Sequence, residues 1–174
     1  NGTIIWQRSL GSGWAATTPV VYDNVVVAGS GDGQMKGINF NNGTVLWTHK
    51  SGKAIFGVSP YDRDNNALLS SPTIVQDKVF FGSADGHLYC LDLYSGSVLW
   101  SYDFGVPVLS TPLVTGNALF VGTYDGRLYA FTTDADYFVP DENDVDIDGM
   151  ADSWELEYFS SLTNMNKRTD SDND

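Results

Sequence analysis

The sequence predicts an all-β fold assembled from copies of one four-stranded antiparallel unit. Three observations support this prediction. Similar segments recur along residues 1–133, an Asp-Gly pair interrupts each of them, and Val, Tyr, Phe and Trp dominate the runs between. Asp-Gly between apolar-rich runs is a strong hairpin signal. A strict register in which most side chains vary marks one structural unit used several times.

The spacing of the repeat defines the unit. In each copy a proline lies 13 residues before the Asp-Gly aspartate: Pro19 and Asp32, Pro72 and Asp85, Pro112 and Asp125. In the second copy we expect strands over residues 72–75, 78–83, 87–92 and 97–102. Units of about 40 residues with four antiparallel strands predict the blades of a β-propeller.

Residues 1–133 hold about three such blades. Three blades cannot close a ring, since propellers have about 4–8. The chain also begins with NGTIIW, in the same repeat phase as NGTVLW at Asn42. We therefore expect a partial propeller, with the remaining blades in a longer form of the same protein and apolar blade faces open at both ends.

Two segments resemble a known repeat family. CLDLYSGSVLW (Cys90 to Trp100) and, more weakly, GINFNNGTVLW (Gly37 to Trp47) are similar to the tryptophan-docking motif of the pyrroloquinoline-quinone-type propeller repeats, roughly A-x-D-x-x-T-G-x-x-x-W. Asn39 replaces the aspartate in the weaker copy. The resemblance implies that the motif's tryptophan packs between neighbouring blades.

The resemblance assigns structural roles to several residues. We expect Trp6, Trp47 and Trp100 to be docking residues, which agrees with the large buried area and the hydrogen-bonding N–H of an indole. Cys90 stands where other copies have glycine or alanine, so we expect a small buried residue and not a nucleophile. His49 has no partner motif, and neither has His87; both are expected as surface or satisfied strand residues.

The repeat does not specify a cofactor. The quinoprotein dehydrogenases that it resembles carry a catalytic aspartate, a calcium ion at the quinone and often a vicinal Cys-Cys pair. A single cysteine cannot form that pair. We identify no catalytic and no quinone-binding residue, so a non-enzymatic role is favoured while the enzymatic one stays open.

An insertion marks a candidate binding loop. Trp47 and Pro72 are 25 residues apart, whereas the corresponding spacings in the other copies are 13 and 12. The extra residues join the fourth strand of one blade to the first strand of the next, on the same rim as the Asp-Gly turns. Loops on a rigid scaffold often carry binding residues, so Asp62, Arg63 and Asp64 are candidates for recognition. A tolerated surface excursion is the alternative.

Charge is concentrated at the C-terminal end. The formal net charge is −13, and residues 134–174 contain thirteen acidic and two basic side chains, against nine and seven in residues 1–133. This distribution argues against nucleic acid as a partner and favours cations. No apolar run approaches the roughly 18 residues of a membrane helix, so we expect no membrane insertion.

The acidic segment contains a calcium-loop pattern. After a linker over residues 134–143, the stretch DVDIDGMADSWE matches D-x-[DN]-x-[DN]-G-x5-E without a mismatch. Calcium takes six to eight oxygen ligands, and this loop supplies them from its alternating positions and its final glutamate. The expected ligands are Asp144, Asp146, Asp148, the backbone carbonyl of Met150, Asp152 and Glu155.

A second, incomplete loop follows. Asp170, Asp172 and Asp174 take its first three ligand positions. Residues 144–174 thus resemble the dockerin-like and thrombospondin type 3-like calcium repeats of secreted bacterial proteins, which implies an EF-hand-like loop and helix. Since extracellular calcium modules bind at roughly 0.1–1 mM, we expect an exported protein, extracellular or at the cell surface, with a periplasmic location as another option.

These observations predict a function class. The leading hypothesis is an exported propeller scaffold that contacts a protein or a glycan through its rim and carries a calcium-binding C-terminal module. The alternatives are a fragment of a quinone-dependent dehydrogenase and a propeller similar to the outer-membrane assembly factors.

Overall fold

The computed structural model describes residues 2–11, 17–55, 68, 70–115 and 118–132, and the structural statements below concern these residues. The chain divides into two compact units, residues 1–131 and 132–174. The predicted linker and calcium module belong to the second unit and lie outside the described residues, so the proposed domain boundaries remain predictions.

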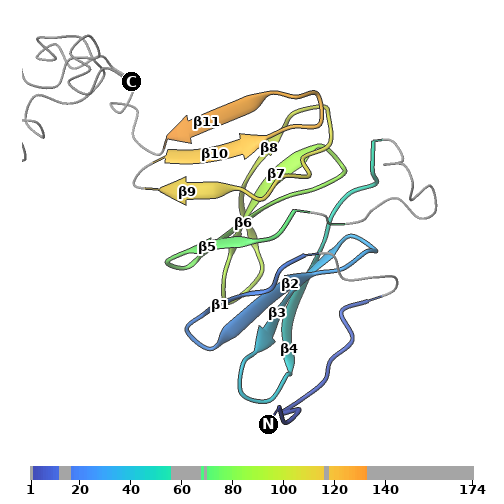
Figure 1. Cartoon of the computed structure of the whole chain (residues 1–174), viewed down its shortest axis with the longest axis vertical. Coiled ribbons are helices and arrows are strands. Elements are labelled where there is room, and N and C mark those ends of the chain that lie inside the picture. The colour runs from blue at the N-terminus through green and yellow to red at the C-terminus, as the bar shows by residue number, and fades with distance from the viewer. Residues whose placement is uncertain (1, 12–16, 56–67, 69, 116–117, 133–174) are drawn as a thin grey trace, which may run out of the picture. The chain divides into compact units, whose positions relative to one another are not determined.

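The first unit consists of three antiparallel sheets (Figure 1). Their strand orders are β1-β2-β3-β4, β5-β6-β7-β8 and β11-β10-β9, and we call them blades 1, 2 and 3. The strands of blade 1 are β1 Val20–Tyr22, β2 Val25–Gly29, β3 Gln34–Asn39 and β4 Val45–Lys50. Those of blade 2 are β5 Thr73–Val75, β6 Lys78–Gly82, β7 His87–Asp92 and β8 Val98–Asp103. Those of blade 3 are β9 Leu113–Thr115, β10 Ala118–Gly122 and β11 Leu128–Thr132.

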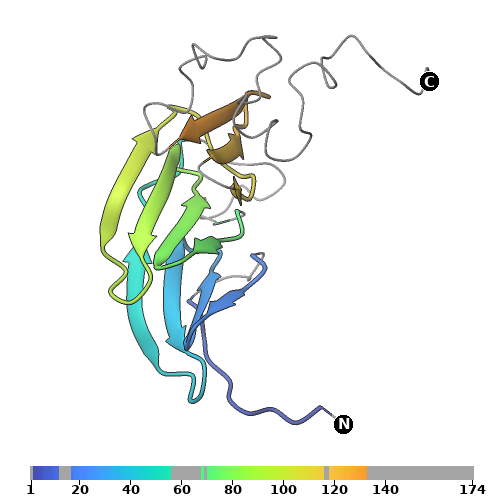
Figure 2. The same cartoon turned by 90° about the vertical axis from the view of Figure 1, so that its left-hand side faces the viewer.

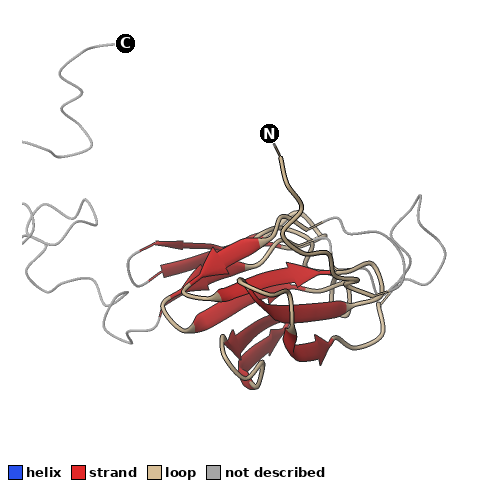
Figure 3. Ribbon diagram, turned by 90° about the horizontal axis from the view of Figure 1, so that it is seen from below, coloured by secondary structure: helices blue, strands red, loops and turns tan. Residues whose placement is uncertain are grey.

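The all-β prediction is confirmed. Every regular element in the described part is a strand (Figure 3), so that part holds no helix of the length and apolarity needed to cross a membrane. The four strands expected in the second copy match β5 to β8 to within one residue at each end. The short first strands lie next to one another, β1 beside β5 and β5 beside β9. In Figure 2 the fourth strands β4 and β8 lie along the other side of the unit.

Apolar side chains fill the two spaces between blades. Between blades 1 and 2 the largest fully buried residues are Phe81, Met35 and Leu68. A second cluster joins blades 2 and 3 around Leu88 and Val121. Because successive side chains of a strand point to opposite faces, β6 can supply both clusters, with Val79 and Phe81 in the first and Phe80 beside the second.

The predicted docking role of the tryptophans is confirmed most clearly by Trp47. Its side chain is only 7% exposed, and its indole N–H donates to the carbonyl of Leu93 in blade 2 at 2.7 Å. The ring lies against Gly96, where a Cβ would stand 2.6 Å from its Cδ2 atom. Gly96 also has a φ of +70°, which side chains rarely adopt. The turn after β7 is therefore shaped to receive the ring.

Trp6 repeats this arrangement one blade earlier. Its N–H donates to the carbonyl of Phe40 at 2.7 Å, and its ring lies against Gly43. Trp100 differs, since 38% of its side chain is exposed and it meets Phe131 edge to face. The sequence has Asp136 at the repeat position of Gly96, so the third copy lacks the glycine against which the other two rings lie.

The weaker motif copy makes the same turn as the stronger one. Asp92 Oδ1 accepts hydrogen bonds from the backbone N–H groups of Tyr94 and Ser95 at 3.1 and 2.7 Å. Asn39 Oδ1 accepts from the corresponding N–H groups of Asn41 and Asn42 at 3.0 and 3.2 Å. Asn and Asp side chains both support such turns, so the substitution at Asn39 preserves the turn that positions the tryptophan platform.

Hydroxyl groups before each proline join neighbouring strands. Thr17, Ser70 and Ser110 each accept a hydrogen bond at 2.9 Å from a backbone N–H twelve residues later, at Gly29, Gly82 and Gly122. The next residue along links blades instead. Thr18 N–H donates to Ser71 Oγ at 2.8 Å, and Ser71 N–H donates to Thr111 Oγ1 at 3.2 Å. This hydroxyl ladder runs from blade 1 to blade 3.

We predict that Trp47→Ala lowers the free energy of unfolding by about 3–5 kcal/mol, the range measured for the loss of a buried large aromatic side chain. Trp100→Ala is the matched control and should cost clearly less, because its ring is partly exposed. Urea unfolding of both variants measures the difference. Equal losses would contradict the docking role assigned to Trp47.

Candidate interaction rim

The residues predicted from sequence as binding or metal-ligating all lie outside the described part. These are the rim-loop residues Asp62, Arg63 and Asp64, and the ligands Asp144, Asp146, Asp148, Met150, Asp152, Glu155, Asp170, Asp172 and Asp174. Their roles remain predictions. The structure does describe the frame that carries the loop.

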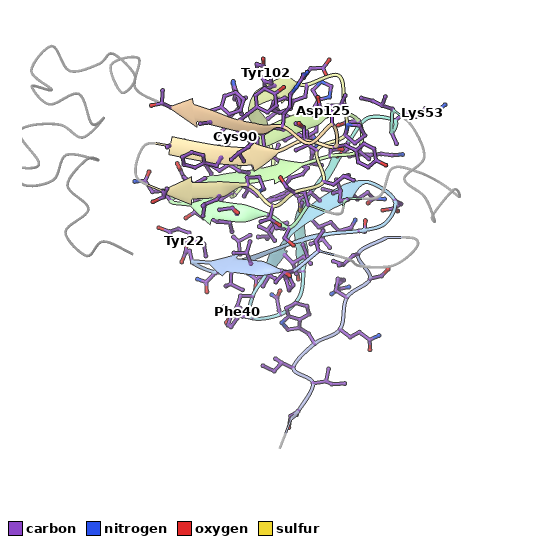
Figure 4. All side chains as sticks on the ribbon, turned by 45° about the horizontal axis from the view of Figure 1, so that its top comes forward. Tyr22, Phe40, Lys53, Cys90, Tyr102 and Asp125 are labelled. Atoms are coloured by element: carbon purple, nitrogen blue, oxygen red, sulfur yellow. The ribbon has the colours of Figure 1, made fainter. Side chains whose placement is uncertain are left out.

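The three Asp-Gly turns occupy corresponding places in the three blades, between β2 and β3, β6 and β7, and β10 and β11. We call the side of the propeller that they form the DG rim. In Figure 4, Asp125 and Lys53 lie toward this side, whereas Tyr22, the last residue of β1, and Phe40, the residue after β3, lie away from it. The strand order requires this, since Tyr22 precedes the turn between β1 and β2.

Both ends of the inserted loop are tied to the DG rim. Before the insertion, Ile55 N–H donates to the carbonyl of Ala84 in the blade 2 turn at 3.0 Å. After it, Leu68 N–H donates to the carbonyl of Ser30 beside the blade 1 turn at 3.3 Å, and the Leu68 side chain is fully buried. The stems of residues 56–67 are thus held by two blades at once.

The carboxylate of Asp85 accepts several hydrogen bonds at the rim. The residue is 8% exposed, and its carboxylate accepts hydrogen bonds from Gly52 N–H at 2.6 Å, Tyr89 Oη at 2.7 Å and His87 N–H at 3.1 Å. Gly52 follows the last strand of blade 1, so this carboxylate joins two blades. A buried charge is tolerated only when it is paired or hydrogen-bonded, and Asp85 meets that condition.

The corresponding aspartates are held differently. Asp32 accepts from Ser30 Oγ and, at 2.9 Å, from Gln34 Nε2, and Gly11 lies against its carboxylate. Asp125 accepts from Thr123 Oγ1 at 2.5 Å and pairs with Arg127 at 3.2 Å. The hydrogen bond from Thr123, followed by the charge of Arg127, lowers the pKa of the Asp125 carboxyl.

For blade 3 the corresponding glycine, Gly105, does not donate its N–H to the Asp-Gly aspartate. Gly11, Gly52 and Gly105 each stand five residues after a docking tryptophan. Gly105 N–H donates to Asp103 Oδ1 of its own blade at 2.8 Å, and a Cβ built on it would meet nothing within 4 Å. The 30% exposed side chain of Asp125 is accordingly more open to solvent than that of Asp85.

An aromatic cluster lies behind Asp85. The Tyr89 ring stacks on Phe81 at 5.3 Å and on His87 at 5.4 Å, and His49 of blade 1 meets it edge to face at 4.9 Å. Burial, then the hydrogen bond to Asp85, raises the pKa of Tyr89. Burial lowers the pKa of His49, against the opposing charge of Asp85. The folded protein therefore favours the neutral form of the His49 imidazole.

This cluster adds a shared partner to the sequence-based interpretation of the histidines. Both lie on strands, as expected, and both contact Tyr89. Two ring nitrogens, His49 Nε2 and His87 Nδ1, are buried without a hydrogen bond in the described structure. The prediction for Cys90 holds, because it is buried, and burial raises the pKa of its thiol to about 11. Among the described residues no group of three or more His, Cys, Asp or Glu is placed to hold a metal ion.

Comparison with known proteins identifies the family. A family model described as "Outer membrane protein assembly factor BamB" matches residues 1–61 and 62–136, which meet inside the inserted loop. The chain belongs to this family. The match confirms the predicted propeller repeat of the pyrroloquinoline-quinone type. It ends near the start of the acidic segment and does not extend to the predicted calcium module.

Individual BamB proteins resemble parts of the chain. The BamB of Salmonella typhimurium is 28% identical over 102 residues, covering 56% of this chain and 25% of the relative. The BamB of Escherichia coli is 31% identical over 108 residues, with the same coverage. The chain thus spans about a quarter of the length of these curated relatives.

Solved structures show the same fold. BamB from Moraxella catarrhalis superposes with a TM-score of 0.56 at 21% identity, covering 66% of this chain and 36% of that one. A quinohemoprotein alcohol dehydrogenase from Comamonas testosteroni gives 0.53 at 20% identity, covering 70% and 19%. At these identities the likeness is one of fold.

We predict that Asp85→Ala destabilises the protein by at least about 2 kcal/mol, because the substitution leaves the buried donors of Gly52 and Tyr89 without a hydrogen-bond acceptor. Asp125→Ala is the matched control at the same repeat position and should cost less than about 1 kcal/mol. Urea unfolding measures both. The proposed link between blades would be wrong if the two variants were equally stable.

Proposed function

We propose that this protein is a non-enzymatic propeller scaffold that binds a protein partner through its DG rim during the assembly of outer-membrane proteins. Membership in the BamB family supports the proposal, because the curated relatives are named outer membrane protein assembly factors. The likeness to quinohemoprotein dehydrogenases is one of fold and does not favour quinone chemistry. No specific observation favours a glycan ligand over a protein.

The rim supports this role by its construction. The carboxylate of Asp85 and the aromatic rings behind it fix the blade 2 turn. Ile55 and Leu68 fix the two ends of the inserted loop. When a rigid scaffold holds both ends of a loop, the residues between them need not stabilise the fold and can serve in recognition. Asp62, Arg63 and Asp64 are the residues that we propose contact the partner.

We further propose that residues 144–155 bind calcium. The donors are carboxylates and a backbone carbonyl, the hard oxygen ligands that calcium prefers. Asp144, Asp146, Asp148, Asp152 and Glu155 would provide the charge, and the carbonyl of Met150 one neutral ligand. Asp170, Asp172 and Asp174 would begin a second site. The ion would give fixed structure to a segment whose own charges repel.

The proposed functions agree on a location outside the cytoplasm. Outer-membrane assembly takes place in the cell envelope, and calcium loops of moderate affinity need a compartment in which the ion is plentiful. We propose an exported protein, and the family favours the periplasmic side over the extracellular one.

We predict that a photo-reactive phenylalanine analogue placed at Lys53 crosslinks to a component of the outer-membrane assembly machinery in intact cells. The same analogue at Phe40, an exposed position on the opposite rim, is the matched control. Mass spectrometry identifies the adduct, and the crosslink is then repeated with the purified component. Adducts from Phe40 alone, or from neither position, would refute the rim as the binding surface.

We predict that isothermal titration of the full chain with calcium gives a dissociation constant of roughly 0.1–1 mM, the range of extracellular modules. Asp148→Ala should remove a ligand and weaken binding at least tenfold. Asp134→Ala, outside the loop pattern, is the control and should leave the constant unchanged. Equal binding by both variants would show that the tail attracts calcium only by its net charge.

A further inference from the structure

An imidazole lies where β4 of blade 1 packs on β6 and β7 of blade 2, a contact that we call the first joint. His49 belongs to β4 and pairs with the fully buried Met35 of β3. Its ring meets Tyr89 at 4.9 Å and Phe81 at 5.9 Å, both edge to face. Its Nε2 atom is buried and makes no hydrogen bond with the described residues. A positive charge on this ring would therefore lose hydration without gaining an acceptor at Nε2.

The strands around His49 bring few charges to it. Its uncharged neighbours are Met35 of β3, Phe81 of β6 and Tyr89 of β7. His87 of β7 lies on Tyr89 and not on His49 itself. Lys50 is exposed and belongs to the other face of β4, since successive side chains of a strand alternate. The charged side chain that acts on His49 is Asp85, from the turn before β7.

The carboxylate of Asp85 favours a proton on His49 but does not offset the burial. Its oxygens already accept from Gly52 N–H, Tyr89 Oη and His87 N–H. Burial lowers the pKa of His49, and the charge of Asp85 opposes this effect without cancelling it. The unfolded chain therefore takes up the proton first as the pH falls. The stability that depends on a neutral His49 is present above the ordinary histidine pKa of about 6.5 and is lost as the pH falls below it toward the folded-state value.

The contact between blades 2 and 3, the second joint, has a different residue at this position. Tyr102 follows Trp100 by two residues, as His49 follows Trp47. Its ring meets Phe104 at 4.8 Å and Phe131 at 5.2 Å, both edge to face. A phenol is neutral in its protonated form. Mild acid therefore adds no charge to this ring.

The first joint also holds the stems of the inserted loop. Gly52, three residues after His49, donates its N–H to Asp85 of blade 2. Ile55 donates its N–H to the Asp-Gly turn of the same blade at 3.0 Å. Leu68, at the other stem, is fully buried in the apolar cluster of this joint. Loosening of the joint would therefore free both ends of the loop.

We propose that the first joint is an acid-sensitive switch, in which a proton on His49 loosens the packing of β4 on blade 2 and releases the stems of the inserted loop. The second joint stays packed under the same conditions. Histidine suits such a switch because its charge changes between about pH 5 and 8. The switch lies in the fold itself and does not depend on which partner the DG rim binds.

Amide hydrogen exchange of the full chain, followed by NMR at about pH 7.5 and about pH 5.5, tests this on either side of the ordinary histidine pKa. The protection factor of Ile55, which is corrected for the direct effect of pH on exchange, should fall at least about threefold in acid. Tyr124 N–H donates to the carbonyl of Pro107 at 2.9 Å beside the second joint and should keep its protection. An equal loss at Ile55 and Tyr124, or no loss at Ile55, would overturn the proposal.

Substitutions identify the group that takes the proton. His49→Phe keeps an aromatic ring that cannot be charged, so the protection of Ile55 should no longer fall in acid. His87→Phe is the matched control, because it removes the imbimidazole that lies 3.5 Å from Asp85 and should lose protection as the wild type does. If His49→Phe does not fold, His49→Tyr takes its place with the residue type that blade 2 has at this position. Acid sensitivity that persists in the folded His49 variant, or that disappears only with His87→Phe, would refute the role of His49.

Discussion

The array depends on how one indole meets the turn of the next blade. Trp47 buries its ring against Gly96 and places its N–H on the carbonyl of Leu93. This contact needs a small residue across the strand pair, an acceptor side chain to close the turn and a glycine for the ring to lie against. Each of these needs corresponds to one position of the sequence motif. The positions of the motif are therefore the residues that form one blade-to-blade interface.

That correspondence explains why the sequence predicted so much of the fold. Turn chemistry and strand periodicity are local, so the limits of β5 to β8 could be inferred closely from residues 72–102. The Asn39 copy was predictable too, since an amide oxygen closes the turn as a carboxylate does. The inserted loop could be assigned to the DG rim because successive strands of a blade run in opposite directions. A connection from a fourth strand to the next first strand therefore lies at the same rim as the turn between a second and a third strand.

The hydrogen bonds and ring contacts between blades could not be predicted from the sequence. Gly52 and Asp85 are 33 residues apart, and nothing local indicates that one donates to the other. The same holds for His49 and Tyr89, whose rings meet only because two blades pack. A signal was available in part: a glycine follows each docking tryptophan by five residues. The candidate metal ligands are the opposite case, because a calcium loop is contiguous and its pattern is visible without any fold.

The hydroxyl ladder has an energetic consequence. Ser71 accepts a hydrogen bond from the N–H of Thr18 and donates its own N–H to Thr111. Blade 2 thus takes part in both of these hydrogen bonds, while blades 1 and 3 each take part in one. The two apolar clusters share this nearest-neighbour character. In such arrays the total stability is approximately a sum over units and adjacent interfaces. Opening of blade 2 would therefore disrupt both of these described interfaces, whereas opening of blade 1 or blade 3 would disrupt one of them, so amide exchange within the three described blades should be slowest in blade 2.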